Sequence, residues 1–217
     1  MLQIKSFTFN PFSENTYVLH DDTSEAIIID PGCYEREEKA ELFDYIKTYK
    51  LIPIKVLNTH CHIDHVLGNA FAINTYDIPL WFHKDEEPVL RAVTSYASNY
   101  GFPSYQDSNA NHYIKEEEVI KFGNTRLKAI LVPGHAPGHL VFYHEESKIC
   151  IGGDTLFQGS IGRTDLPGGD HETLLTAIKE KLFTLPEDVV IYPGHGLTTT
   201  IGYEKLNNPF VGKKARY

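Results

Sequence analysis

Five apolar runs of this sequence stop directly before a polar residue that can bind a metal ion. Each run is short and rich in branched side chains, which predicts a buried strand that ends at a loop. Strands hold the bases of the loops that follow them, so ligand sites in sheet proteins tend to lie at strand ends. The pattern therefore predicts that five strand ends converge on one site. The five stretches are AIIIDPG (26–32), PIKVLNTHCH (53–62), KAILVPGH (128–135), KICIGGD (148–154) and DVVIYPGH (188–195).

The densest group of metal-capable side chains is HCHIDH, residues 60–65. His60 and His62 follow an apolar run directly. Residues two apart in an extended chain share one face and lie about 6.6 Å apart along it. Both imidazoles can therefore close on a single metal ion.

Asp64 and His65 follow a predicted turn. The stretch 67–77 has a helical pattern, so the extended chain must turn near residue 63. This turn directs the two side chains away from the first histidine pair and toward a second metal ion. Imidazole nitrogen and carboxylate oxygen suit zinc, iron or manganese.

Two metal ions need about six to eight protein ligands, and the later strand ends supply more. His135 follows VPG, Asp154 follows IGG and His195 follows YPG. Glycines beside these residues allow the backbone to pack closely around an ion. A lone PGH is usually only a loop, but three such strand ends together with HCHIDH favour a two-metal site.

Composition and charge favour one globular, cytoplasmic domain over residues 1–217. The chain is 41% hydrophobic and 23% charged, which is ample for a core. Its formal charge of −9 argues against a nucleic-acid or anionic-membrane partner. No apolar run approaches the ~20 residues of a membrane span, and we see no secretory signal. The 3 cysteines form no CxxC motif, which is typical of reduced thiols.

The apolar periodicity predicts strands that alternate with helices. Three short strands precede an amphipathic helix over 35–50, with Leu42, Phe43 and Ile46 as its apolar stripe. Residues 101–118, rich in Tyr, Asn and Asp, predict a long loop.

HCHIDH with a downstream His, Asp and His resembles the metallo-β-lactamase superfamily of hydrolases. The order of the ligands is similar to that of its glyoxalase II branch, over nearly the whole chain. GDTLFQGSIGRTDLPGGD (153–170) is typical of short bacterial glyoxalase II-like hydrolases. The resemblance implies an α/β fold, a four-layer αβ/βα sandwich in which two mixed β-sheets are flanked by helices.

By that resemblance, seven side chains hold two divalent metal ions, zinc by default and iron or manganese in some relatives. The ligands are His60, His62 and His135 for the first ion, Asp64, His65 and His195 for the second, and Asp154 as the bridge between them. Asp64 and Asp154 are the expected catalytic carboxylates. Asp30 matches the first motif of the family, where a carboxylate steadies a ligand imidazole. Arg163 is the candidate that grips a substrate carboxylate, with a structural ion pair as an equal alternative.

The implied reaction is hydrolysis of thioesters of the S-lactoylglutathione type. Two metal ions about 3.5–4 Å apart share a water and lower its pKa from ~15.7 toward ~7, and the bridging hydroxide attacks the acyl carbon. A thiol with a pKa near ~8.5 then leaves readily. Full-length glyoxalase II enzymes bind glutathione partly through a C-terminal helical region, and about twenty residues follow His195. We therefore expect another thiol carrier or acyl compound to be possible.

Other functions stay open. Persulfide dioxygenases resemble the same pattern but use one iron, held by two His and one Asp, and consume oxygen. A hydrolase of another small acyl ester is a further alternative. A β-lactamase is less favoured, because several such enzymes use Cys in place of Asp154. A metal-dependent binding protein is the non-enzymatic alternative, although a structural zinc site needs only four ligands. A small-molecule substrate is the only partner expected, and the oligomeric state is open.

Overall fold

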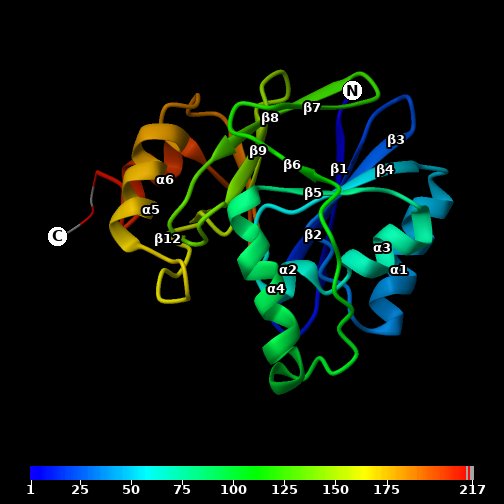
Figure 1. Cartoon of the computed structure of the whole chain (residues 1–217). Helices are drawn as coiled ribbons and strands as arrows, with labels where there is room; N and C mark the ends of the chain where they lie inside the picture. Colours follow the sequence, from blue (N-terminus) through cyan, green and yellow to red (C-terminus); the bar gives the residue numbers. More distant parts are fainter. Residues whose placement is uncertain (214, 216–217) are drawn as a thin grey trace. The chain divides into compact units, whose positions relative to one another are not determined.

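The computed structural model describes residues 1–213 and 215. The chain divides into two compact units, which we call the N-terminal unit (Met1–Ile114 and Ile120–Arg126) and the C-terminal unit (Lys115–Val119 and Leu127–Tyr217). Figure 1 shows the whole chain and labels most of its helices and strands. The described residues form two mixed six-stranded sheets and a small two-stranded one. The predicted pair of mixed sheets with flanking helices is confirmed, whereas the single domain stays a prediction.

The first sheet has the strand order β1-β2-β3-β4-β5-β6. Its strands are β1 (Gln3–Phe9), β2 (Glu14–His20), β3 (Glu25–Ile29), β4 (Ile52–Leu57), β5 (Leu80–Phe82) and β6 (His112–Tyr113). The first three form an antiparallel meander, and β3 to β6 run parallel. Because Ile29 pairs with Leu57, β3 and β4 end side by side. The residues that follow these two strands therefore share one edge of the sheet.

Helices connect the parallel strands. They are α1 (Arg36–Thr48), α2 (Ile63–Val66), α3 (Asn69–Tyr76) and α4 (Glu87–Tyr96), with single 3-10 turns η1 (Lys84–Glu86) and η2 (Ala97–Tyr100) beside α4. Glu35 and Glu38 form a capping box at the start of α1, as helix N-termini favour. The predicted apolar stripe of α1 is wrong at one position. Leu42 and Ile46 are buried, but Phe43 is 39% exposed and lies beneath the Lys47 ammonium group.

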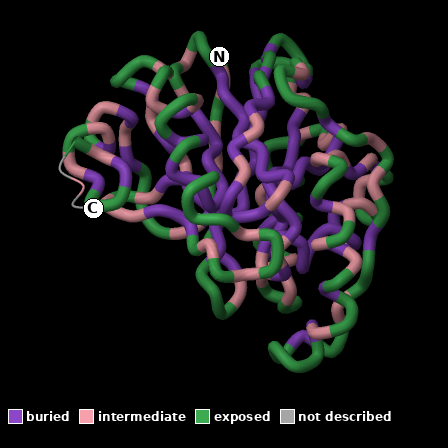
Figure 2. The backbone as a smooth tube through the Cα atoms, turned by 60° about the vertical axis from the view of Figure 1, so that its left-hand side comes forward, coloured by how far each residue is buried: buried purple, intermediate pink, exposed green. Residues whose placement is uncertain are grey.

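The core of the N-terminal unit lies between this sheet and its helices. Every residue of β2 is buried, as are four of the five residues of β3, so these strands are covered on both faces. Figure 2 shows the buried backbone in purple and the exposed loops in green. The three cysteines Cys33, Cys61 and Cys150 are buried free thiols. Within the described residues, no helix is long and apolar enough to span a bilayer.

The second sheet has the strand order β14-β13-β10-β9-β8-β7. Its strands are β7 (Val119–Phe122), β8 (Thr125–Leu131), β9 (Leu140–His144), β10 (Ile149–Gly153), β13 (Val190–Pro193) and β14 (Thr199–Thr200). A short hairpin of β11 (Leu156–Phe157) and β12 (Ser160–Ile161) follows β10. The helical segments are α5 (His171–Ala177), which continues as the π-helical turn η3 (Ile178–Leu182), and α6 (Ile201–Asn207). Because β10 and β13 are parallel, with Ile151 opposite Tyr192, they end at the same edge.

Asp21 ties the turn after β2 to the tip of the β7–β8 hairpin. Its carboxylate accepts hydrogen bonds from the Thr23 N–H and hydroxyl (3.0 and 2.5 Å), the Asn124 N–H (2.7 Å) and the Thr125 hydroxyl (2.9 Å). Partial burial raises the pKa of Asp21, but these hydrogen bonds outweigh burial and lower the pKa to about 2.

We expect Asp21→Asn to lower the free energy of unfolding by about 2 kcal/mol at pH 7, since each pKa unit is worth ~1.4 kcal/mol. The folded-state pKa is depressed, so this stabilisation is full above the ordinary pKa of 3.8 and is lost as the pH falls through about 2. Urea unfolding at pH 7 and near pH 2 measures both values. Asp22→Asn is the control, because the Asp22 side chain is 70% exposed. An equal loss for Asp21→Asn at both pH values would contradict the assignment.

Candidate metal centre

Four of the predicted ligands lie together beyond the end of β4. We call His60, His62, Asp64 and His65 the N-terminal cluster. The chain remains extended through His62, which caps α2 with φ −66° and ψ 154°. The ring centroid of His60 lies 4.8 Å from that of His62 and 4.1 Å from that of His65. The predicted turn near residue 63 is confirmed, because α2 begins at Ile63.

Asp30 lies behind this cluster because β3 and β4 end side by side. Its Oδ1 accepts the Thr59 N–H (2.7 Å), and its Oδ2 accepts the Thr59 hydroxyl (2.5 Å). The same Oδ2 lies 3.2 Å from Nδ1 of His65. Asp30, His60 and His65 are close enough to form a metal site of their own. However, both Asp30 oxygens already accept hydrogen bonds from the protein, which favours an orienting role over direct ligation.

The Asp30 carboxylate also sets the tautomers of two imidazoles. Nδ1 of His65 donates to it, so the lone pair of that ring lies on Nε2. Thr59 uses its hydroxyl proton on Asp30, so its oxygen accepts from Nδ1 of His60, 3.1 Å away. The His60 lone pair is therefore also on Nε2. Both rings are prepared as ligands through the same nitrogen.

The backbone of Asp30 is strained. Its φ of 49° lies in the left-handed region, which non-glycine residues rarely adopt. Such a conformation costs about 1–3 kcal/mol and persists where the surroundings impose it. Here the Asp30 N–H donates to the Leu57 carbonyl (2.9 Å), and the side chain is held by Thr59.

Glu14 was not expected from the sequence, yet it is completely buried beside His65. Its Oε1 lies 3.9 Å from Nδ1 of His65, and its Oε2 accepts the Thr16 hydroxyl (2.8 Å). Burial raises the pKa of Glu14 well above its ordinary range, and the nearby His65 only partly opposes this shift. The only local signal was an acidic residue at the start of the strand ENTYVLH.

Glu86 is a second carboxylate that the sequence analysis missed. It is 0% exposed, and its Oε2 accepts the backbone N–H of Cys61 at 2.8 Å. Cys61 joins His60 to His62, so Glu86 fixes the peptide between two predicted ligands. The two partners are 25 residues apart in the sequence, and no local pattern links them.

The other three predicted ligands lie together in the C-terminal unit. We call His135, Asp154 and His195 the C-terminal cluster. Oδ2 of Asp154 lies 3.6 Å from Nε2 of His135 and 3.5 Å from Nε2 of His195. The Gly194 N–H donates to the Gly153 carbonyl (2.8 Å), which holds the ends of β10 and β13 together.

These spacings fit ligands that share a metal ion better than they fit hydrogen bonds. A hydrogen bond between nitrogen and oxygen is about 2.7–3.2 Å long. Two ligand atoms on a tetrahedral ion lie about 3.4 Å apart, given bonds of about 2.0–2.2 Å. Nε2 of His65 and Oδ2 of Asp64 are also 3.6 Å apart. The carboxylate of Asp154 therefore faces two imidazoles at ligand spacing, and Asp64 faces one.

Backbone groups orient the C-terminal cluster. Nδ1 of His135 lies 2.7 Å from the Arg163 carbonyl oxygen, so the ring donates there and keeps its lone pair on Nε2. Nε2 of His139 accepts the Asp154 N–H (3.0 Å), so this imidazole positions the backbone of Asp154. Gly162 packs so closely that a Cβ there would lie 1.9 Å from the Asp154 carbonyl oxygen. Only glycine fits at that position.

The Arg163 guanidinium forms a bidentate ion pair with Asp165. Its Nε donates to Oδ1 at 2.7 Å, and its Nη2 donates to Oδ2 at 2.8 Å. Both side chains are more than 60% exposed. The hydrogen bonds from Arg163 lower the pKa of Asp165 to about 2. This is the structural ion pair that we weighed against a substrate role.

We expect Asp30→Asn to weaken metal binding by about 10–100-fold. The new amide group replaces one acceptor oxygen with a donor, so it cannot accept from all three donors, which are the Thr59 N–H, the Thr59 hydroxyl and Nδ1 of His65. Competition with a chromophoric chelator measures the affinity. Asp44→Asn, an exposed position on α1, is the matched control. Unchanged affinity in Asp30→Asn would refute the orienting role.

Glu86→Gln and Glu86→Leu should differ in metal affinity. The glutamine retains an oxygen that accepts the Cys61 N–H, so we expect affinity within about threefold of the parent. The leucine leaves that buried N–H without its partner at a cost of about 1–3 kcal/mol, and we expect a loss of about tenfold or more. The same chelator competition, with Glu87→Leu as the neighbouring control, measures this. Equal affinities for the two Glu86 variants would show that the hydrogen bond is irrelevant.

Comparison with known proteins places the chain in a family. A sequence profile of the Metallo-beta-lactamase superfamily matches residues 9–195, a range that includes both clusters. The chain is 36% identical over 217 residues to the Hydroxyacylglutathione hydrolase GloC of Haemophilus influenzae, covering 99% of this chain and 100% of that protein.

Comparison with solved structures supports the same family. The crystal structure of the B3 metallo-beta-lactamase BLEG-1 matches with a TM-score of 0.88 and 36% identity, over 96% of this chain and 99% of that one. The structure of TTHA1623 in a di-iron-bound form matches with a TM-score of 0.83 and 34% identity, over 95% of this chain and 99% of that one. The predicted metallo-β-lactamase fold is thus confirmed. The chain is a metallo-hydrolase, and it belongs to the metallo-β-lactamase superfamily.

Proposed function

We propose that this protein hydrolyses thioesters of the S-lactoylglutathione type, and that the N-terminal and C-terminal clusters together bind two divalent metal ions. The observation that carries the proposal is the Asp154 carboxylate, whose Oδ2 faces Nε2 of His135 and of His195 at 3.6 and 3.5 Å. One carboxylate oxygen at ligand spacing from two imidazoles can share a metal ion with either of them, as the proposed bridging role requires. Zinc is our first choice, and iron is supported by the di-iron form of the similar TTHA1623 structure.

The choice of a thioester rests on the relative named Hydroxyacylglutathione hydrolase, which aligns with this chain from end to end. A thiol with a pKa near ~8.5 leaves as the thiolate at neutral pH. Such a substrate needs no acidic side chain to protonate the leaving group. This suits the two clusters, because every predicted member is assigned as a metal ligand and none is reserved as a proton donor.

The chain's own groups prepare the site for this reaction. When bound, two divalent ions acidify a water and polarise the acyl oxygen. His60, His65 and His135 would each offer Nε2 to a metal ion, because Nδ1 of each ring faces an oxygen of the protein. With Asp64 and Asp154 as the anionic ligands, the proposed site keeps a formal charge of about +2, which stabilises negative charge that develops on the acyl oxygen.

β-Lactam hydrolysis is a second candidate. The observation that favours it is the 36% identity to a structure described as a B3 metallo-beta-lactamase. Cleavage of a lactam also begins with attack of water on an acyl carbon, so the same side chains can serve it. An amide nitrogen is a far poorer leaving group than a thiolate, and this favours the thioester.

The test is a substrate panel on purified, metal-loaded protein. We expect turnover of S-lactoylglutathione or a related small thioester that exceeds hydrolysis of a chromogenic cephalosporin. Chelation of the metal and His60→Ala should each lower kcat/KM by at least about 100-fold. His171→Ala, an exposed histidine on α5, should leave kcat/KM unchanged. Metal analysis should find two ions per chain.

The other outcomes identify the rivals. Cephalosporin turnover without thioester turnover would establish the β-lactamase. One iron per chain together with oxygen uptake on glutathione persulfide would establish the dioxygenase. Thioester turnover that survives both chelation and His60→Ala would refute the proposed centre.

A further inference from the structure

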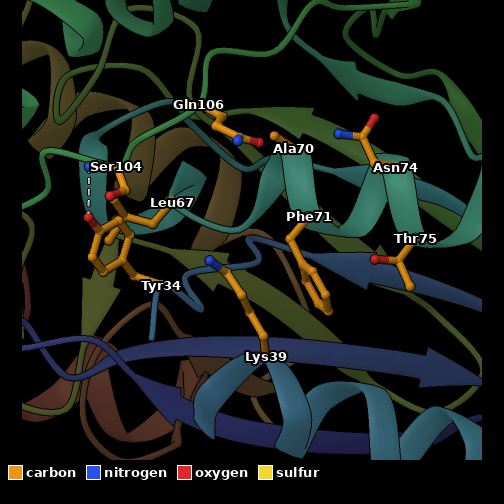
Figure 3. Close-up of a pocket in the computed structure, with 9 residues that line it drawn as sticks. All are labelled: Tyr34, Lys39, Leu67, Ala70, Phe71, Asn74, Thr75, Ser104 and Gln106. Atoms are coloured by element: carbon orange, nitrogen blue, oxygen red, sulfur yellow. Dashed lines mark hydrogen bonds between the residues drawn. The ribbon is translucent and has the colours of Figure 1, made fainter. Parts of the chain in front are cut away.

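A pocket of about 360 Å³ lies in the N-terminal unit between α1, α3 and the loop around Ser104. Figure 3 shows the side chains that line it. They are Tyr34, Lys39, Leu67, Ala70, Phe71, Asn74, Thr75, Ser104 and Gln106. None of them belongs to the predicted ligand set. The volume is within the range of sites for small molecules, about 300–1,000 Å³.

Lys39 supplies the only charge among these lining residues, on a chain with a net charge of −9. Its side chain is half-buried and reaches into the pocket in Figure 3. In the described part of the chain its ammonium group forms no ion pair, and it lies 5.4 Å from the centroid of the Tyr34 ring.

Glu38, the acidic residue next to Lys39 in the sequence, already accepts hydrogen bonds from the protein. Glu38 accepts hydrogen bonds from the backbone N–H groups of Asn10 (2.6 Å), Tyr34 (2.7 Å) and Glu35 (3.0 Å). The bond from Glu35 belongs to the capping box of α1, and all three bonds commit the Glu38 carboxylate to backbone N–H groups. The positive charge of Lys39 is thus left for an external anion.

The Tyr34 hydroxyl is a second donor in the same pocket. Its oxygen accepts the Ser104 N–H at 2.9 Å, which fixes its position. No described residue accepts its proton. An ammonium group and a hydroxyl that share a pocket suit the two oxygens of a carboxylate, and hydrogen bonds to a charged acceptor are the strong ones.

The other lining residues of the pocket suit a ligand whose remaining part is apolar. Leu67 is buried at 4% exposure, Ala70 at 7%, and Phe71 is a half-buried member of the same lining. The polar residues Asn74, Thr75, Ser104 and Gln106 are exposed and carry no charge. A hydrated inorganic anion would leave the Phe71 side of the pocket unused.

We propose that this pocket binds a small monocarboxylate with an apolar body, held by Lys39 and Tyr34 at the carboxylate and by Phe71, Leu67 and Ala70 at the body. The site is separate from the metal ligands and does not depend on the thioesterase activity. A pocket open to solvent with one cation supports only weak binding, and we expect a Kd of about 1–5 mM.

The test is a titration of zinc-loaded, ¹⁵N-labelled protein with phenylacetate, followed by amide chemical shifts. We expect shifts at Ala70, Phe71, Thr75 and Gln106. Phenylacetamide, the neutral counterpart, and inorganic phosphate should each bind at least about tenfold more weakly. Shifts confined to residues 60–65 would mean that the carboxylate binds only the metal, and would overturn the proposal.

Variants separate the two donors. Lys39→Met should weaken phenylacetate binding at least about tenfold, and Lys39→Arg should keep it within about threefold. Tyr34→Phe should weaken it about threefold. Lys47→Met is the matched control, because Lys47 is on the same helix, lies over an aromatic ring, and is outside the pocket. If phosphate binds as tightly as phenylacetate, or if Lys39→Met binds like the parent, the proposal fails.

Discussion

The Asp30 carboxylate is the interaction on which the N-terminal cluster depends. One side chain accepts the Thr59 N–H and hydroxyl and lies against Nδ1 of His65. Through Thr59 it also sets the tautomer of His60. This arrangement exists because Ile29 pairs with Leu57, so that two parallel strands end at the same level. Sheet register is therefore the physical origin of the ligand geometry.

The strand ends and the ligand cluster could be predicted from the sequence because their signals are local. An apolar run predicts the strand. Because the backbone after it is extended, the side chains of His60 and His62 lie on the same face. The turn at residue 63 follows from the helical pattern beyond it, and α2 begins there. Phe43 was misplaced because helical periodicity alone does not show which edge of an apolar stripe meets the core.

The supporting carboxylates could not be predicted, because their partners are distant in the sequence. Glu86 accepts the Cys61 N–H only because β5, which precedes it, returns the chain to the same edge of the sheet. Glu14, at the start of β2, lies beside His65 only in the folded structure. The left-handed backbone of Asp30 is likewise imposed by tertiary contacts, since nothing in IIIDPG requires it. Sequence reasoning found the side chains with metal-binding chemistry and missed those that hold them in place.

The same carboxylates show why the N-terminal cluster favours a cation. Glu14, Asp30 and Asp64 surround one imidazole, and the charges of Asp30 and Asp64 add to burial in raising the pKa of Glu14. Crowded acidic groups in a low-dielectric interior are costly unless a positive charge compensates them. A bound metal ion supplies that charge while using the imidazole lone pairs that Asp30 has oriented. Metal binding here would be linked to folding of this region, since a ligand that binds only the folded state stabilises it.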